Sequence, residues 1–182
     1  MTPPAIRRLH ALDDAQVDGL AALLLDCIEG GASVGFMHPL TYASAVAFWR
    51  RVARAVGAGE RALLVAEDEQ GICGTVHLVL DQPENQPHRA DLTKMLVHRR
   101  ARRRGLGVAL VRSAEDVARA SGKTLLVLDA VTGGDGARLY ERTGWQRVGD
   151  IPGYALFPRG GFCSTKTYRR WRLSVNGSQR VY

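Results

Sequence analysis

The chain has 182 residues, of which 46% are hydrophobic and 24% are charged, and its formal net charge is +7. This length and composition are typical of one globular domain with a sizeable core, and the apolar runs are too short to span a bilayer. The amino-terminal residues lack the apolar core of a signal peptide, so we expect a cytoplasmic protein with no membrane partner.

Three cysteines, Cys27, Cys73 and Cys163, lie far apart in the sequence. They form no C-x-x-C pair and have no histidine at a spacing typical of metal ligands. We therefore expect small, reduced, buried side chains and no metal site.

Periodicity and turn residues predict a strand, two helices, three strands, a helix, a strand, a helix and two strands. This order favours a three-layer α/β/α fold, in which helices cover both faces of one mixed sheet. We expect one domain over residues 1–173 and a tail over residues 174–182. The strands are expected at 5–10, 61–67, 72–81, 90–97, 124–128, 145–150 and 164–173, and the helices at 13–29, 40–56, 105–120 and 136–142.

The most informative stretch is residues 91–120, where an apolar strand is followed by a basic turn and an amphipathic helix. Five arginines lie within residues 98–104, and Gly105-Leu106-Gly107 follows them. The start of a helix leaves backbone N–H groups unpaired and carries partial positive charge. Glycines let a ligand approach those groups, and arginines add charge-assisted hydrogen bonds. The stretch therefore predicts a diphosphate site.

Two motifs indicate which diphosphate is bound. The chain has no P-loop string, and the spacing of its glycines fits a dinucleotide fingerprint poorly. Residues 102–107 match [RQ]-x-x-G-x-[GA], and residues 139–145 match L-Y-x-x-x-G-F/W. Together with the element order, these motifs resemble the GCN5-related N-acetyltransferases (GNAT). The resemblance implies acetyltransferase activity and acetyl-CoA as the cofactor, although Gly133 stands where the family usually has asparagine. The residues that it implies for cofactor binding are Met95, Leu96, Val97, Arg102, Arg103, Arg104, Gly105, Leu106, Gly107, Val108 and Tyr140.

A closer resemblance concerns the acceptor. The sequence is similar to that of the tabtoxin-resistance acetyltransferases, which acetylate a small amino-acid-like toxin, in four segments: residues 30–37, 94–97, 128–129 and 149–154. This implies a small amine as acceptor and a role in toxin resistance. The residues expected to line the acceptor pocket are Ser33, Phe36, Met37 and Tyr154.

Acetyl transfer to an amine needs a base for the amine, donors for the carbonyl oxygen and an acid for the leaving thiolate. The resemblance makes Tyr140 the candidate acid, with a plain core aromatic as the alternative. Asp91, which opens a strand, and Asp129, expected just past the end of the next strand, are the candidate bases. The alternative for both is a solvated strand end. A backbone N–H near Leu96 is the expected oxyanion donor, and we expect Lys94 to be a surface or strand-edge residue.

Three other functions stay open at this point. A protein N-terminal or lysine acetyltransferase would need an open groove for a peptide. A nucleic-acid-binding domain could use the arginine run, but no aromatic residue lies between His98 and Gly107, so we expect no nucleic-acid partner. A CoA-binding protein without catalysis is the third alternative. We expect direct acetyl transfer to a small amine by a monomer or a homodimer.

Overall fold

The computed structural model describes residues 4–171, and the predicted tail at 174–182 lies outside them. The predicted order of strands and helices is confirmed, with one 3-10 turn added. The helical elements are α1 (Asp14–Glu29), α2 (Tyr42–Gly57), η1 (Arg99–Ala101), α3 (Leu106–Ala120) and α4 (Asp135–Arg142). The strands are β1 (Ala5–Leu9), β2 (Arg61–Asp68), β3 (Gly71–Val79), β4 (Arg89–Val97), β5 (Leu125–Val131), β6 (Gln146–Leu156) and β7 (Phe162–Trp171).

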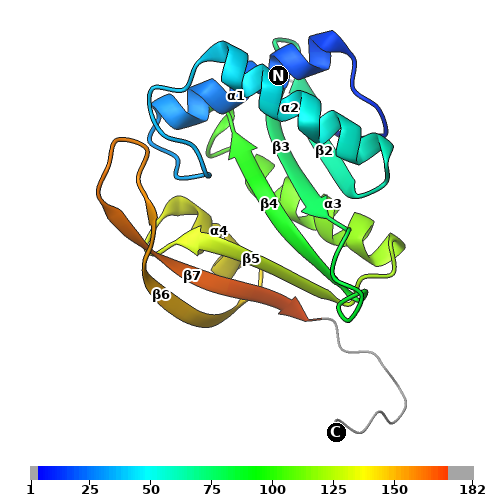
Figure 1. Ribbon diagram of the computed structural model, residues 1–182, viewed down its shortest axis with the longest axis vertical. Helices are drawn as coiled ribbons and strands as arrows, with labels where there is room; N and C mark the ends of the chain where they lie inside the picture. Colours follow the sequence, from blue (N-terminus) through cyan, green and yellow to red (C-terminus); the bar gives the residue numbers. More distant parts are fainter. Residues whose placement is uncertain (1–3, 172–182) are drawn as a thin grey trace, which may run out of the picture.

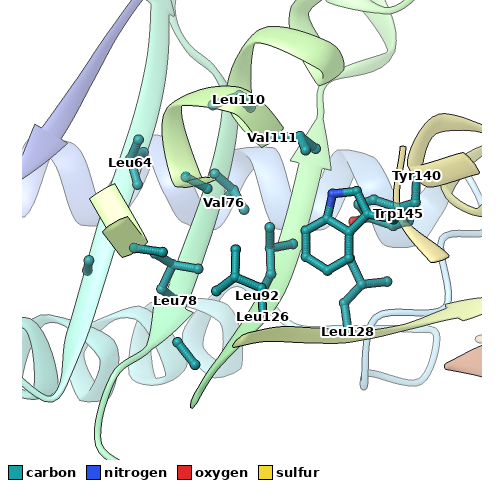
Figure 2. Close-up of a cluster of buried hydrophobic side chains, with 14 of the residues drawn as sticks. Leu64, Val76, Leu78, Leu92, Leu110, Val111, Leu126, Leu128, Tyr140 and Trp145 are labelled. Atoms are coloured by element: carbon teal, nitrogen blue, oxygen red, sulfur yellow. The ribbon is translucent and has the colours of Figure 1, made fainter. Parts of the chain in front are cut away.

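One seven-stranded sheet in the order β1-β2-β3-β4-β5-β7-β6 forms the middle layer. Helices α1 and α2 lie on one face of the sheet, and α3 and α4 lie on the other (Figure 1). Each face has its own apolar core. Trp49 and Leu20 belong to the core under α1 and α2. Leu110 and Trp145 belong to the core under α3 and α4 (Figure 2). The predicted three-layer mixed α/β fold is therefore confirmed.

The start of α1 follows from its sequence. Asp13 accepts a hydrogen bond from the Gln16 N–H at 2.8 Å, and the Gln16 side chain accepts one from the Asp13 N–H at 3.1 Å. This is the capping box that the spacing of the two residues predicts.

Strands β4 and β5 form the parallel pair of the sheet, and they stay paired only at one end. Residues Arg89 to Asp91 pair with Leu125 to Val127, and no pairing continues beyond Asp91 within the described chain. Past this point the two strands diverge, as the green and yellow arrows in Figure 1 show. The carboxyl-terminal halves of β4 and β5 therefore leave a break in the sheet.

A β-bulge in β4 lies beside this break. His77 pairs with Thr93 and Thr75 pairs with Leu96, so Lys94 and Met95 together stand opposite a single residue of β3. Lys94 has a φ of 49°, as one residue of a bulge often requires. The bulge reverses the alternation of side chains along the strand. As a result, Leu96 packs under α1 and α2, whereas Leu92 packs under α3.

Two predicted strand ends are wrong. Strand β5 continues to Val131 because β7 pairs with it along its whole length, so Asp129 lies within the strand and not past its end. Strand β6 was expected to end at Asp150, but it runs to Leu156. The register shifts between Ile151 and Ala155, which lets the strand pass the proline and glycine in that segment and pair with β7 again.

Candidate active site

The amino-terminus of α3 has the properties of an anion site. Its N-cap residue, Gly105, has a φ of 78° and provides no side-chain hydrogen bond, and the first turn contains no acidic residue. The first N–H groups of a helix have no partner within the helix. Gly105 and the three arginines before it are exposed. A diphosphate supplies the negative charge and the acceptor oxygens that such a helix start binds, so these residues fit that group.

Arg99 and Arg100 of the basic turn pair with acidic side chains of other elements, whereas the side chain of Arg102 donates to the Val97 carbonyl at 3.1 Å. The side chain of Arg99 donates to Asp26 at 2.8 Å, and Arg100 forms an ion pair with Asp68. Burial tends to raise the pKa of Asp26, but the backbone and side-chain hydrogen bonds from Arg99 outweigh it and lower the pKa. These pairs fasten the turn to α1 and to the end of β2. The exposed arginines of the predicted cofactor set, residues 102–104, lie next to the start of α3.

The two glycines of the motif have different physical roles. A side chain at Gly105 would meet no atom within 4 Å, so the requirement there is the left-handed backbone. A Cβ at Gly107 would lie 3.1 Å from Leu139 and 3.4 Å from Met95. Gly107 therefore allows α3 to pack closely against α4 and β4, whereas the sequence had suggested ligand access as the reason for both glycines.

Tyr140 lies on α4 and only 5% of its surface is exposed. Its ring lies beside that of Trp145 (Figure 2), with centroids 5.7 Å apart, and its centroid is 6.1 Å from that of Tyr168. The core-packing alternative therefore describes the ring correctly. The hydroxyl forms no hydrogen bond with the described residues. Burial raises the pKa of Tyr140, so the hydroxyl stays protonated at neutral pH and can donate.

The candidate bases, Asp91 and Asp129, lie where β4 and β5 diverge. Asp91 pairs with Val127, and Asp129 is two residues further along β5, so both carboxylates are on the same face of the sheet. Asp91 accepts hydrogen bonds from Gln82 and Arg89, each at 3.3 Å. Asp91 is half-buried and Asp129 is exposed. The structure thus places near each other two residues that the rest of β4, η1 and the whole of α3 separate in the sequence.

Asp129 also contacts the final hairpin. It accepts hydrogen bonds from Thr167 at 2.8 Å and from the Tyr154 hydroxyl at 3.2 Å. The negative charge of Asp129, followed by desolvation, raises the pKa of Tyr154. Tyr154, which was predicted to contact the acceptor, therefore touches a predicted base.

The connection between α1 and α2, residues 30–41, lies beside the hairpin of β6 and β7 (Figure 1). Ser33 donates to the Leu156 carbonyl at 3.1 Å, and the His38 N–H donates to the Pro158 carbonyl at 2.8 Å. The carboxylate of Glu29 is 2.7 Å from His38 and 3.0 Å from Arg159. These contacts join two segments that are far apart in the sequence.

The other two predicted acceptor residues lie on this connection. Phe36 stands edge-on to Phe48, with ring centroids 5.0 Å apart. Met37 is 48% exposed. Ser33, Phe36 and Tyr154 each contact another segment of the chain, but Tyr154 is 51% exposed, much like Met37.

Lys94 was expected at the surface, but the structure places it differently. It is half-buried, and its ammonium group lies 5.8 Å from the centroid of Phe36 and 5.9 Å from that of Phe48. Burial, with a further contribution from Arg61, lowers the pKa of Lys94. The bulge in β4 brings Lys94 to Phe36 in the segment before α2, and no local sequence pattern predicts that bulge.

Comparison with known proteins identifies the family. The model of the acetyltransferase (GNAT) family matches residues 35–145. The chain belongs to the GNAT family. An uncharacterised N-acetyltransferase from the hisH–hisA intergenic region of Azospirillum brasilense is 30% identical over 131 residues, which cover 71% of this chain and 76% of that protein.

Solved structures share the fold at low sequence identity. A Salmonella typhimurium structure described as an acetyltransferase with its cofactor acetyl-CoA has a TM-score of 0.76 and 16% identity, covering 99% of this chain and all of the other. A ribosomal-protein-alanine N-acetyltransferase from Brucella melitensis has a TM-score of 0.75 and 19% identity, covering 92% of this chain and 99% of the other.

Membership of this family makes the chain a GNAT-type acetyltransferase with acetyl-CoA as its cofactor, and these two predictions are confirmed. Residues 4–171 contain no group of three or more histidine, cysteine or acidic side chains placed to hold a metal ion. No helix in that part of the chain is long and apolar enough to cross a membrane.

Proposed function

We propose that the protein transfers an acetyl group directly from acetyl-CoA to the amine of a small, amino-acid-like or toxin-like molecule. The observation that carries this proposal is the pair Asp91 and Asp129 on one face of the sheet, where β4 and β5 diverge. The segment of residues 30–41 and the β6–β7 hairpin lie against each other beside this region. The predicted cytoplasmic location belongs to the same proposal.

The cofactor is held by the start of α3 and by the strand that precedes it. Its diphosphate is bound by the N–H groups of residues 105–108 and by the side chains of Arg102, Arg103 and Arg104. The part of the cofactor that leads to the thioester lies along β4, at Met95, Leu96 and Val97. Bound acetyl-CoA supplies an activated acyl group as a thioester. A backbone N–H near Leu96, next to the bulge, donates to the carbonyl oxygen as that oxygen gains charge.

The two carboxylates prepare the acceptor amine. They attract its ammonium form, and one of them removes a proton, either directly or through a water molecule. Tyr154 and Thr167 orient Asp129, while Gln82 and Arg89 orient Asp91. We assign the role of the base to the two carboxylates together and not to one of them.

Tyr140 acts as the acid for the leaving thiolate. Its hydroxyl has no partner among the described residues, and its ring is held by the core. Gly133, in place of the usual asparagine, has a φ of 74° and offers no side chain to the cofactor.

The cysteines support direct transfer over a covalent acetyl-enzyme. Cys27, Cys73 and Cys163 are all free and buried. Burial raises the pKa of Cys27 and of Cys73 to about 11, so both thiols are neutral at pH 7 and poor nucleophiles. An acyl carrier needs an accessible thiolate, and these side chains do not provide one.

The test is a thiol-release assay with acetyl-CoA and a panel of amino acids, polyamines and peptides, combined with mass spectrometry of the products. We expect turnover with small amines and acetylation at nitrogen. Turnover with peptides alone would favour the protein-acetylating alternative, whose name the Brucella melitensis structure carries. Binding of acetyl-CoA without turnover on any amine would favour a non-catalytic CoA-binding protein.

A further inference from the structure

The face of the sheet under α2 contains several buried polar atoms that lack a partner. Three buried atoms on this face have no hydrogen-bond partner among the residues that the structure describes: Trp49 Nε1, His77 Nε2 and Thr93 Oγ1. Trp49 and His77 are both 0% exposed, and their ring centroids are 6.0 Å apart. His77 and Thr93 stand opposite each other on β3 and β4. These atoms therefore belong to one small region of the protein.

The protonation of these groups shows that the region contains hydrogen-bond donors without acceptors. Arg61 lies 3.4 Å from His77 Nδ1, and a guanidinium can only donate, so Nδ1 accepts and the proton resides on Nε2. Burial, together with the charges of Arg61 and Lys94, holds the pKa of His77 well below its ordinary value, so the ring is neutral. The indole N–H of Trp49 is also only a donor. Two of the three unpartnered atoms are therefore donors without an acceptor.

Lys94 adds a charged donor to the same region. It follows Thr93 in β4, and the bulge directs it against Phe36 and Phe48. Within residues 4–171, its ammonium forms no hydrogen bond or ion pair with an acidic side chain. A half-buried cation beside unpartnered donors matches an anionic ligand that provides acceptor oxygens.

We propose that Lys94 binds the carboxylate of the acetyl acceptor beside Phe36 and Phe48, and that the acceptor is therefore an amino-acid-like zwitterion. This inference rests on the proposed function. Asp91 and Lys94 are three residues apart on β4, which is at most about 10 Å along a strand. A small zwitterion spans the space between their side chains, with its ammonium at Asp91 and Asp129 and its carboxylate at Lys94. The buried donors of Trp49 and His77 keep the surroundings favourable for negative charge.

Three variants test this assignment. Lys94→Met removes the charge and keeps most of the side-chain volume, and Lys94→Arg keeps the charge. Arg51→Met is the matched control, because the exposed Arg51 guanidinium lies 6.0 Å from the centroid of the same Phe48 ring. Each variant is assayed by thiol release with acetyl-CoA, the standard L-amino acids and their carboxamides, and its melting temperature is measured.

The expected result separates charge recognition from folding. Wild type should use the acids better than the matching carboxamides. Lys94→Met should raise KM for the acids about 10- to 100-fold, the loss of one charge-assisted hydrogen bond, with little change in kcat or in KM for the carboxamides. Lys94→Arg should retain part of the preference for acids, and Arg51→Met should behave like wild type.

Three results would overturn the proposal. Equal use of acids and carboxamides by wild type would remove the carboxylate from recognition, although the proposed acetyltransferase function would stand. A fall in kcat for both classes in Lys94→Met, with a shifted pH profile, would make Lys94 a base. No turnover by wild type with any small amine, while acetyl-CoA still raises the melting temperature, would refute the small-amine function and this inference together.

Discussion

Replacing Tyr140 with phenylalanine or alanine separates its proposed role as an acid from its role in the core. Phenylalanine keeps the ring that packs against Trp145 and Tyr168, and it removes only the hydroxyl. Alanine removes the ring as well. Phenylalanine therefore tests the role of the hydroxyl in the reaction, whereas alanine tests the role of the ring in the stability of the core.

The magnitudes follow from the surroundings of the side chain. The hydroxyl has no hydrogen bond with the described residues, so Tyr140→Phe should change the free energy of unfolding by less than about 1 kcal/mol. Because Tyr140 is only 5% exposed, Tyr140→Ala should lose about 3–5 kcal/mol through the cavity that it leaves. If the hydroxyl protonates the thiolate, Tyr140→Phe should lower kcat by roughly 10- to 1000-fold with little change in KM for acetyl-CoA.

Tyr168 provides the matched control. Its hydroxyl donates to Glu141 at 2.8 Å, and its ring lies in the same core. Tyr168→Phe should therefore cost about 1 kcal/mol of stability and leave kcat unchanged. Thiol-release kinetics and urea unfolding of the three variants measure both effects. Full activity in Tyr140→Phe would refute the acid assignment and leave Tyr140 as a packing residue only.

Three further predictions concern the carboxylates, the turn before α3 and the dependence of stability on pH. Asp91→Asn and Asp129→Asn should each lower kcat, most strongly at or below neutral pH, where the acceptor is an ammonium ion. Both variants should keep the rise in melting temperature that acetyl-CoA causes. Full rates in both variants at every pH would exclude the pair as the base. Gly105→Val should abolish the stabilisation by acetyl-CoA, whereas Gly59→Val, at a comparable φ of 76° and with the same backbone strain of about 1–2 kcal/mol, should keep it; equal thermal shifts in the two variants would refute the diphosphate site. Asp26→Asn should destabilise the protein by about 1 kcal/mol at neutral pH, since its arginine partner is half-exposed and screened. The pKa of Asp26 is lowered on folding, so this difference should be complete above the ordinary carboxyl value of about 3.9 and disappear as the pH falls below it; a pH-independent difference in urea unfolding would contradict the ion pair.

Local sequence was sufficient to predict the strand, the basic turn and the helix that form the proposed cofactor site. The apolar strand end, the arginines and Gly105 are contiguous, and the helix after them needs no distant contact to be recognised. The same holds for the Asp13–Gln16 capping box. The sequence did not show that Arg99 and Arg100 pair with acidic residues of α1 and β2, because those pairs depend on tertiary packing.

The structure around the proposed acceptor residues depends on non-local pairing, and sequence reasoning was less successful there. Asp129 was placed past the end of its strand because only pairing with β7 extends β5 to Val131. Lys94 was assigned to the surface because a bulge is set by the register between β3 and β4, which no local pattern specifies. The hydrogen bond between Tyr154 and Asp129 likewise requires β6 to continue past Asp150, where the strand was expected to end.

The most direct test of the proposed function is the initial rate of CoA release with acetyl-CoA and a small amine acceptor both varied, with the mass of the product recorded. Direct transfer at the divergence of β4 and β5 requires both substrates to be bound together. We therefore predict intersecting reciprocal plots and an N-acetylated small amine. Parallel plots, which indicate a covalent acetyl-enzyme, or CoA release that appears only with peptides, would contradict the account.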